Sequence, residues 1–251
     1  MTSHYKTISC LLLFLIGIFP CAFAQQYLHS GLIEYEVKTN NIKSMPDGEW
    51  KDLIKDKIPE FSVNYYNYIF SNDQSICKFS RTTDTKSNFS MFGKMEDYVW
   101  YNNYQANEFT NSVSVDNIYL ISGPLQDIEW KIYPTDMRTI AGFSCRKASA
   151  ILFDSVYVFA YYTDEILTPG GPMGLHGLPG MILGVTIPRL YQSWVATRVE
   201  LNIPPKEKIA PPTSGKKKTR EALTTSLLEL SKSWGKDGSK FLNPLIWRMF
   251  M

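Results

Sequence analysis

The sequence predicts an α+β protein built mainly of antiparallel strands, arranged as a curved sheet or half-barrel with two short amphipathic helices packed on it. Two observations lead to this class. Segments in which apolar and polar residues alternate follow one another at intervals of roughly 8–12 residues, which is the spacing of antiparallel β proteins. Only two segments, residues 47–58 and the one that begins near residue 219, carry apolar side chains at helical spacing.

The strands are predicted from alternation and from turn residues. In residues 32–39, Ile33, Tyr35 and Val37 alternate with charged side chains, which indicates a strand with one face in water. Residues 71–73, Ser-Asn-Asp, have the composition of a turn and predict a hairpin. The predicted strands are residues 32–39, 61–70, 74–81, 98–101, 117–121, 128–133, 140–153, 156–162, 181–187 and 191–202.

The first predicted helix, residues 47–58, has one apolar face and ends at Pro59. The second begins after Thr219, which can cap it, and also has one apolar face. These faces consist of Trp50, Leu53, Ile54 and Ile58 in the first helix and of Leu223, Leu227, Leu230 and Trp234 in the second. Residues 235–251 end in an apolar cluster that we expect to dock on the domain, an exposed partner-binding tail being the alternative. Residues 82–117 are mostly polar and give no firm assignment.

Residues 1–24 have the pattern of a secretory signal peptide. A short polar start precedes an apolar run, and residues 22–24, Ala-Phe-Ala, supply the small-residue cleavage pattern before Gln25. The run is shorter than the roughly 20 residues that a membrane-spanning helix needs, so we expect no membrane span. Cys21 raises the alternative of a lipoprotein, but Pro20 stands where a small residue should precede an acylated cysteine.

Residues 25–251 are expected to form a single exported domain. The net charge of the whole chain is only +2, which gives no reason to expect a nucleic-acid partner. The one dense basic cluster consists of Lys216, Lys217 and Lys218 with Arg220, and we interpret it as a solvated helix start.

Two cysteines, Cys77 and Cys145, remain after the predicted signal peptide. In an oxidising compartment a disulfide between them is the default, and it would stabilise the fold by about 4 kcal/mol in the chain-entropy model. Both cysteines lie in predicted strands, which favours a bridge between strands. The alternative is a pair of buried thiols.

The most constrained stretch of the chain is residues 170–185, GGPMGLHGLPGMILGV. Its glycines and prolines predict a rigid irregular loop, and its apolar end predicts a buried strand. It lacks the lysine and serine or threonine of a phosphate-binding loop, and a strand follows instead of a helix. The stretch therefore predicts a structural corner, or else a binding edge. The residues of that edge would be Gly171, Pro172, His176, Gly177, Leu178, Pro179 and Gly180.

The order and spacing of five segments resemble the GLPGLI family of exported bacterial proteins. The segments are residues 130–132 (WKI), 140–148 (IAGFSCRKA), 161–166 (YYTDEI), 171–172 (GP) and 177–183 (GLPGMIL), the last with Met181 in place of a leucine. The resemblance implies a signal-bearing envelope protein built mainly of antiparallel strands and linked to an outer-membrane uptake system. It implies no catalytic residue.

Catalytic chemistry has little support in the sequence, and we expect neither a catalytic residue nor a cofactor. A hydrolase would have to combine Asp164 or Glu165 with His176, although neighbouring residues of an extended segment point to opposite faces. There is no G-x-S-x-G nucleophile motif. A soft-metal site for copper would use Met173, His176 and Met181, but the spacing matches no recognised metal site, and we assign no metal.

Aromatic residues make up 14% of the chain, and apolar residues occupy both faces of some predicted strands. With so few catalytic groups, this composition favours a non-enzymatic binding or accessory protein of the cell envelope. Its expected partner is an apolar or extended ligand, or an outer-membrane protein. The hydrolase and the copper protein remain the alternatives.

Overall fold

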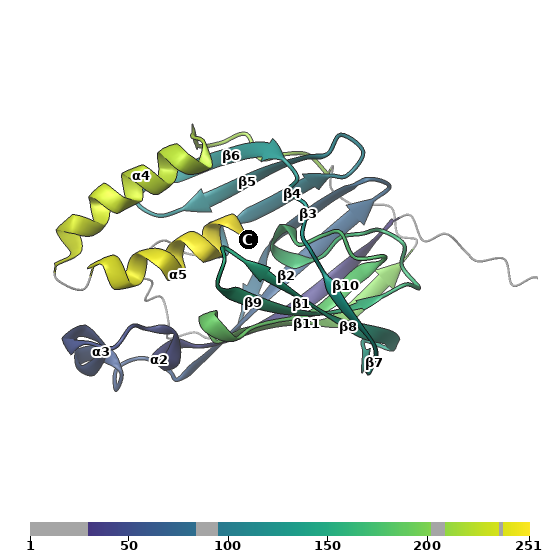
Figure 1. Ribbon diagram of the computed structural model, residues 1–251, viewed down its shortest axis with the longest axis horizontal. Coiled ribbons are helices and arrows are strands. Elements are labelled where there is room, and N and C mark those ends of the chain that lie inside the picture. The colour runs from purple at the N-terminus through teal and green to yellow at the C-terminus, as the bar shows by residue number, and fades with distance from the viewer. Residues whose placement is uncertain (1–29, 84–94, 202–208, 236–237) are drawn as a thin grey trace, which may run out of the picture.

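The computed structural model describes residues 30–83, 95–201, 209–235 and 238–251 (Figure 1). Within them, twelve strands form one sheet that is antiparallel throughout except for its last short strand, so the predicted fold class is confirmed. The strands are β1 (Ser30–Asn40), β2 (Phe61–Ser71), β3 (Gln74–Thr82), β4 (Val99–Asn103), β5 (Glu108–Ser114), β6 (Ile118–Pro124), β7 (Lys131–Ile140), β8 (Phe143–Leu152), β9 (Val156–Thr163), β10 (Met181–Ile187), β11 (Gln192–Leu201) and β12 (Lys216–Lys217). The helices are α2 (Asn41–Ser44), α3 (Glu49–Ile54), α4 (Arg220–Ser231) and α5 (Gly238–Phe250), with four 3₁₀ turns at Met95–Asp97, Pro172–Gly174, Pro188–Leu190 and Lys232–Trp234.

The chain starts in the middle of the sheet and forms it in two runs, the first outward to one edge and the second from the other edge back to the middle. The strand order is β12-β6-β5-β4-β3-β2-β1-β11-β10-β9-β8-β7. From β1 each successive strand is added beside the previous one as far as β6; the chain then passes to β7 at the opposite edge and returns inward to β11, which pairs with β1. The sheet is open, with β12 and β7 as its edge strands. The half-barrel itself stays a prediction at this point.

One face of the sheet holds the main core. Tyr68, Cys77, Trp100, Asn111 and Ile121 lie directly opposite one another on β2 to β6 and therefore share this face. All five are buried. We call this side the buried face of the sheet.

A smaller cluster lies on the other side of the same strands. Ile69 and Tyr101 are packed there with Ile209, so β2 and β4 are covered on both faces over part of their length. For β2, aromatic residues at successive positions had predicted this.

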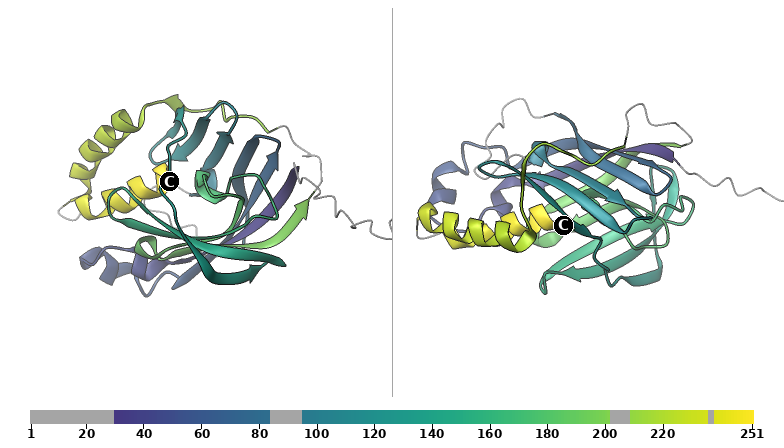
Figure 2. Two further views of the ribbon diagram at one scale, coloured as in Figure 1. Left: turned by 45° about the vertical axis from the view of Figure 1, so that its right-hand side comes forward. Right: turned by 90° about the horizontal axis from the view of Figure 1, so that it is seen from above.

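The C-terminal part of the chain docks on the sheet through helices α4 and α5. The Thr219 side chain accepts a hydrogen bond from Ala222 N and starts α4, as predicted. Leu223 and Leu227 of α4 are buried in the core. Residues 235–251 are not an irregular tail but include α5, whose C-terminal end lies over the middle of the sheet (Figures 1 and 2).

The first predicted helix is wrong in extent and in packing. Only Glu49–Ile54 is helical, in α3, and this helix lies beyond the ends of the strands (Figure 1). Of the predicted apolar face, Ile54 is buried, whereas Trp50 is 40% exposed and Leu53 61% exposed. One buried residue in a six-residue helix is too little to anchor it on the sheet. Helix α5 packs on the sheet instead (Figure 1).

The predicted disulfide is also wrong, because Cys77 and Cys145 are free, buried thiols. Cys77 lies on β3 and Cys145 on β8, and five strands stand between them in the sheet order. The sulfur of Cys77 accepts a hydrogen bond from the backbone N–H of Met173, and the Cys145 thiol donates to Phe143 O over 3.6 Å. Burial raises the pKa of Cys77 to about 12 and that of Cys145 to about 11, as expected for unreactive thiols.

Candidate functional site

Residues 170–180 lie against the buried face and form a close-fitting structural corner. A Cβ atom on Gly170 would stand 2.1 Å from Tyr68 Oη and 2.3 Å from Tyr104 Oη, so only glycine fits there. Gly180 has a φ of 141°, and a Cβ atom on it would stand 2.0 Å from Thr163 O. Leu178 is only 1% exposed. The glycines thus serve close backbone approach.

A hydrogen-bonded network joins this loop to the sheet. Tyr104 Oη lies 3.0 Å from both Tyr68 Oη and Ser75 Oγ. Asn102 Nδ2 donates to Gly174 O over 3.2 Å. We call these five residues the loop network. Its buried polar groups are paired with one another, as a purely structural element requires.

His176 is oriented by two backbone contacts. Its Nδ1 lies 2.8 Å from Gly174 O, and because a carbonyl oxygen can only accept, Nδ1 carries the proton and Nε2 keeps a lone pair. The indole of Trp130 donates to His176 O over 2.8 Å. The side chain is half-buried and close to Tyr104. His176 therefore has the tautomer of a base or a metal ligand.

The structure does not connect the predicted acids to this histidine. Asp164 accepts from Arg146 Nη1 over 2.6 Å, and Glu165 Oε1 accepts from Ser144 N over 3.1 Å. In the part of the chain that the structure describes, no hydrogen bond or ion pair joins His176 to either carboxylate. Both acids follow the end of β9 and instead bind residues of β8, the strand beside it.

The two methionines of the copper alternative are core residues. Met173 is 1% exposed and Met181 is fully buried. Met173 has a φ of 57°, which turns the chain inside the loop. The described residues contain no group of three or more His, Cys, Asp or Glu side chains that could hold a metal ion.

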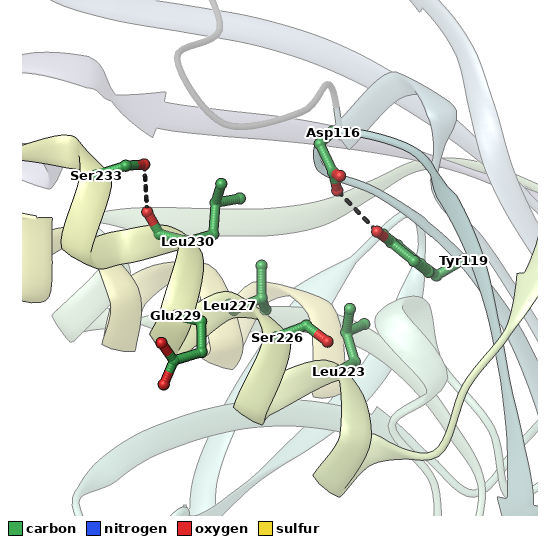
Figure 3. A pocket seen from close by; sticks show the side chains of 8 residues that line it. All are labelled: Asp116, Tyr119, Leu223, Ser226, Leu227, Glu229, Leu230 and Ser233. Carbon is green, nitrogen blue, oxygen red and sulfur yellow. Dashed lines mark hydrogen bonds between the residues drawn. The ribbon is translucent and has the colours of Figure 1, made fainter.

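A pocket that the sequence did not reveal lies between α4 and the turn from β5 to β6 (Figure 3). It is half-open and has a volume of about 340 Å³. Three leucines of α4 give it an apolar wall, and hydroxyl and carboxylate groups surround them. The lining residues are Asp116, Tyr119, Leu223, Ser226, Leu227, Glu229, Leu230 and Ser233. The leucines had been predicted as a helix face, but nothing in the sequence paired that face with Asp116 and Tyr119.

The polar side of this pocket is held in place by hydrogen bonds. Asp116 accepts from Tyr119 Oη and from Asn117 Nδ2, each over 2.9 Å. Burial acts to raise the pKa of Asp116, but the hydrogen bonds from Asn117 and Tyr119 outweigh it and hold the pKa below its ordinary value. On α4, Ser226 Oγ accepts from Lys218 Nζ over 2.6 Å.

The basic cluster ahead of α4 differs from the predicted solvated helix start. Lys216 and Lys217 form β12, which pairs in parallel with Tyr119 and Leu120 of β6. Arg220 is half-buried: its guanidinium lies 4.9 Å from the centre of the Phe109 ring and donates to Gln126 Oε1 over 2.9 Å. Only part of the cluster is therefore in water. None of the helices in the described ranges is long and apolar enough to cross a membrane.

No family model and no curated protein matches the chain. Among solved structures, the chain is similar to PNGF-II in two crystal forms, with TM-scores of 0.50 and 0.51, 18% sequence identity and 79% of this chain covered. An uncharacterized conserved protein from Thermus thermophilus matches with a TM-score of 0.33 and 7% identity, over 78% of this chain and 92% of that one. The chain spans 32% of the length of PNGF-II, so the likeness shows a shared fold and nothing of activity.

Proposed function

We propose that this chain is a non-enzymatic binding or accessory protein of the bacterial cell envelope that holds a ligand with an apolar part. The observation that carries the proposal is the pocket of about 340 Å³ with its wall of three leucines. This volume lies in the range of small-molecule sites, and polar groups around an apolar wall are the usual lining of such sites. The predicted signal peptide over residues 1–24, which lies outside the described residues, supports the location.

The half-barrel belongs to the same proposal, and the connection between β6 and β7 supports it. These strands are ten strand positions apart in the sheet order, which would separate them by about 48 Å in a flat sheet. The chain covers the way from Pro124 to Lys131 with six residues between them, a reach of about 25 Å. A flat sheet is incompatible with that reach, so we propose that the strands curve around the loop network and α5.

The alternatives have weaker support. The hydrolase would need a contact between His176 and Asp164 or Glu165, and these carboxylates are engaged with β8. The copper site would need Met173 and Met181, whose side chains are buried in the core. The resemblance to GLPGLI proteins supports an outer-membrane partner linked to uptake, and this partner remains part of the proposal.

Binding of a neutral apolar fluorophore, N-phenyl-1-naphthylamine, tests the pocket. We expect saturable binding to the protein and at least about tenfold weaker binding to Ser226→Trp, because an indole would fill the space beside the leucines. Thr225→Trp is the matched control, since Thr225 is exposed on the same helix and does not line the pocket. Absence of binding, or equal weakening by both variants, would contradict the proposal.

A further inference from the structure

Two half-buried arginines lie at the contact between the C-terminal helices and the sheet. Arg248 of α5 and Arg220 of α4 each have an Nε atom that is buried without a hydrogen-bond partner. Within the described ranges, neither arginine forms an ion pair with a carboxylate. Burial lowers the pKa of both guanidinium groups below the ordinary value. A buried charge without a counter-charge is unfavourable, so these two side chains need an explanation beyond packing.

The strand register places both arginines along β5. Phe109, Asn111 and Val113 alternate on the buried face of this strand. The guanidinium of Arg220 lies over Phe109, at one end of this row. Arg248 lies near Tyr98, whose hydroxyl donates to Ser114 O at the other end of the row. Asn111 lies between Phe109 and Val113 in this row, so it stands between the ends that Arg220 and Tyr98 contact.

Three more polar atoms on the same face have no partner. Asn111 Oδ1, Trp100 Nε1 and Tyr66 Oη are all buried without a hydrogen bond. Trp100 lies directly opposite Asn111 on β4, and its ring centre is 6.1 Å from that of Tyr66 and 5.8 Å from that of Tyr98. We call the set of Tyr66, Trp100, Asn111, Arg220 and Arg248 the unpaired strip.

The unpaired atoms of the strip are mostly hydrogen-bond donors. Four of its five unpaired atoms are donors, namely the Tyr66 hydroxyl, the Trp100 indole N–H and the two arginine Nε–H groups. The fifth, Asn111 Oδ1, belongs to an amide whose two ends look alike, and rotating it by half a turn presents its NH₂ group instead. A donor-rich strip with two positive charges that form no ion pair within the described residues favours oxygen acceptors that carry a negative charge.

We propose that the unpaired strip binds an organic carboxylate with an apolar body, between α5 and strands β4 and β5. The carboxylate accepts from Arg248 and Trp100, and the apolar body lies among the aromatic side chains around them. Those neighbours include Tyr98, Trp194 and Phe250. Arg248 as a residue is only half-buried, which leaves the strip a route to solvent. This proposal concerns residues other than those of the α4 pocket and stands independently of it.

The carboxylate is favoured over a water molecule and over inorganic phosphate. Water can accept hydrogen bonds but brings no charge to offset the arginines. Phosphate brings more charge but must lose a larger hydration shell among aromatic rings. A carboxylate with an apolar body matches both the donors and their surroundings.

Titration with decanoate, followed by tryptophan fluorescence and calorimetry, tests the proposal. We expect saturable one-to-one binding of decanoate and at least about tenfold weaker binding of decanol, which has the same body and no charge. Arg248→Met should weaken decanoate binding about 10- to 100-fold, as expected for loss of a charge-assisted hydrogen bond. Arg189→Met is the matched control: Arg189 lies 4.9 Å from the Trp247 ring of α5 but is outside the strip, so binding should be unchanged.

A second variant keeps the test decisive if Arg248→Met fails to fold. Asn111→Asp gives the unpaired strip a carboxylate of its own, so it should raise the melting temperature and also abolish decanoate binding. Trp100→Phe keeps an aromatic ring, removes the N–H donor and should weaken decanoate several-fold. The proposal is overturned if decanol or inorganic phosphate binds as tightly as decanoate, or if Asn111→Asp binds it as well as the unaltered protein.

Discussion

The loop network and the unpaired strip lie side by side on the buried face and differ in whether their polar groups form hydrogen bonds. Ser75 and Asn102 of the network occupy one row of the sheet, and Trp100 and Asn111 of the strip occupy the next. The network pairs its hydroxyl and amide groups internally, whereas the strip leaves five polar atoms without a partner.

This difference separates a structural element from a binding one. A made hydrogen bond contributes about 0.5–1.5 kcal/mol, whereas a buried unmade one costs about 1–3 kcal/mol. The loop therefore stabilises the fold, while the strip lowers stability unless something else fills its hydrogen bonds. The two regions meet at Gly174, where a Cβ atom would stand 3.7 Å from Trp100 and 3.8 Å from Asn102.

The largest expected effect comes from neutral thiol and phenol groups buried in the core around both regions. In the folded protein the pKa of Cys77 is about 12 and that of Cys145 about 11, and burial also raises the pKa of Tyr35, Tyr66 and Tyr68. In the unfolded chain the thiols ionise near pH 8.5. The stability from these groups is thus complete below that pH and is lost as pH rises toward the folded values.

From pH 7 to pH 10 we expect the two thiols to lower the free energy of unfolding by about 4 kcal/mol. Urea unfolding across this range measures the slope. Cys145→Ala should remove about half of the thiol contribution, because one ionising group is gone. A slope that Cys145→Ala leaves unchanged, or stability that falls with reductant at pH 7, would instead favour a disulfide.

Gly170→Ala should break the loop network. Its new methyl group would collide with the hydroxyls of Tyr68 and Tyr104, so we expect a loss of about 3 kcal/mol in urea unfolding. Gly123→Ala is the control, because its nearest contact would be an ordinary 3.4 Å from the Phe109 ring. If both variants lose equal stability, the network is not the reason that glycine is required at position 170.

A pair of hydroxyl deletions compares the two regions most directly. Tyr104→Phe removes a hydroxyl that contacts both Tyr68 and Ser75 and should cost about 1–3 kcal/mol. Tyr66→Phe removes a hydroxyl with no partner and should be neutral or stabilising by about 1 kcal/mol. Chemical unfolding of both variants checks this, and the same sign for both would remove the distinction between network and strip.

The smallest effect should come from the exposed face. Arg81 pairs with Glu34 there and stacks on Tyr65 at 3.7 Å, and the hydrogen bond from Arg81 is the main cause that lowers the pKa of Glu34. Because Arg81 is exposed and water screens the pair from its side, Arg81→Met should cost less than about 1 kcal/mol. That small cost should shrink as pH falls through the lowered pKa of Glu34. A loss above about 2 kcal/mol at pH 7 would mean that the outer face is energetically comparable to the buried one.

Alternation predicted most of the sheet but failed where polar residues face inward. Strand β5 was missed because Asn111 and Ser112 are buried in it, and a buried amide breaks the pattern of apolar residues. Helix α5 was missed as a helix because Pro244 lies inside it, although its docking through an apolar cluster was confirmed.

The candidate sites were the least predictable part. The loop of residues 170–180 was identified by its glycines, because a backbone that packs closely against its neighbours requires glycine. The leucine face of α4 was identified by the helical spacing of its leucines. Neither feature shows what lies opposite it in space. Arg220 was assigned to water because arginine usually lies there; the only hint for Arg248 was a charged residue among the apolar residues at the end of α5.

The two edges of the sheet limit how other chains can attach. Strand β7 carries Pro134 and an irregularity in its register between Tyr133 and Met137, and β12 covers only Tyr119 and Leu120 of β6. Neither offers a long, even row of free backbone groups onto which another strand could be added. We therefore expect the protein to resist edge-to-edge fibril growth even when crowded, and a partner to bind it through side chains.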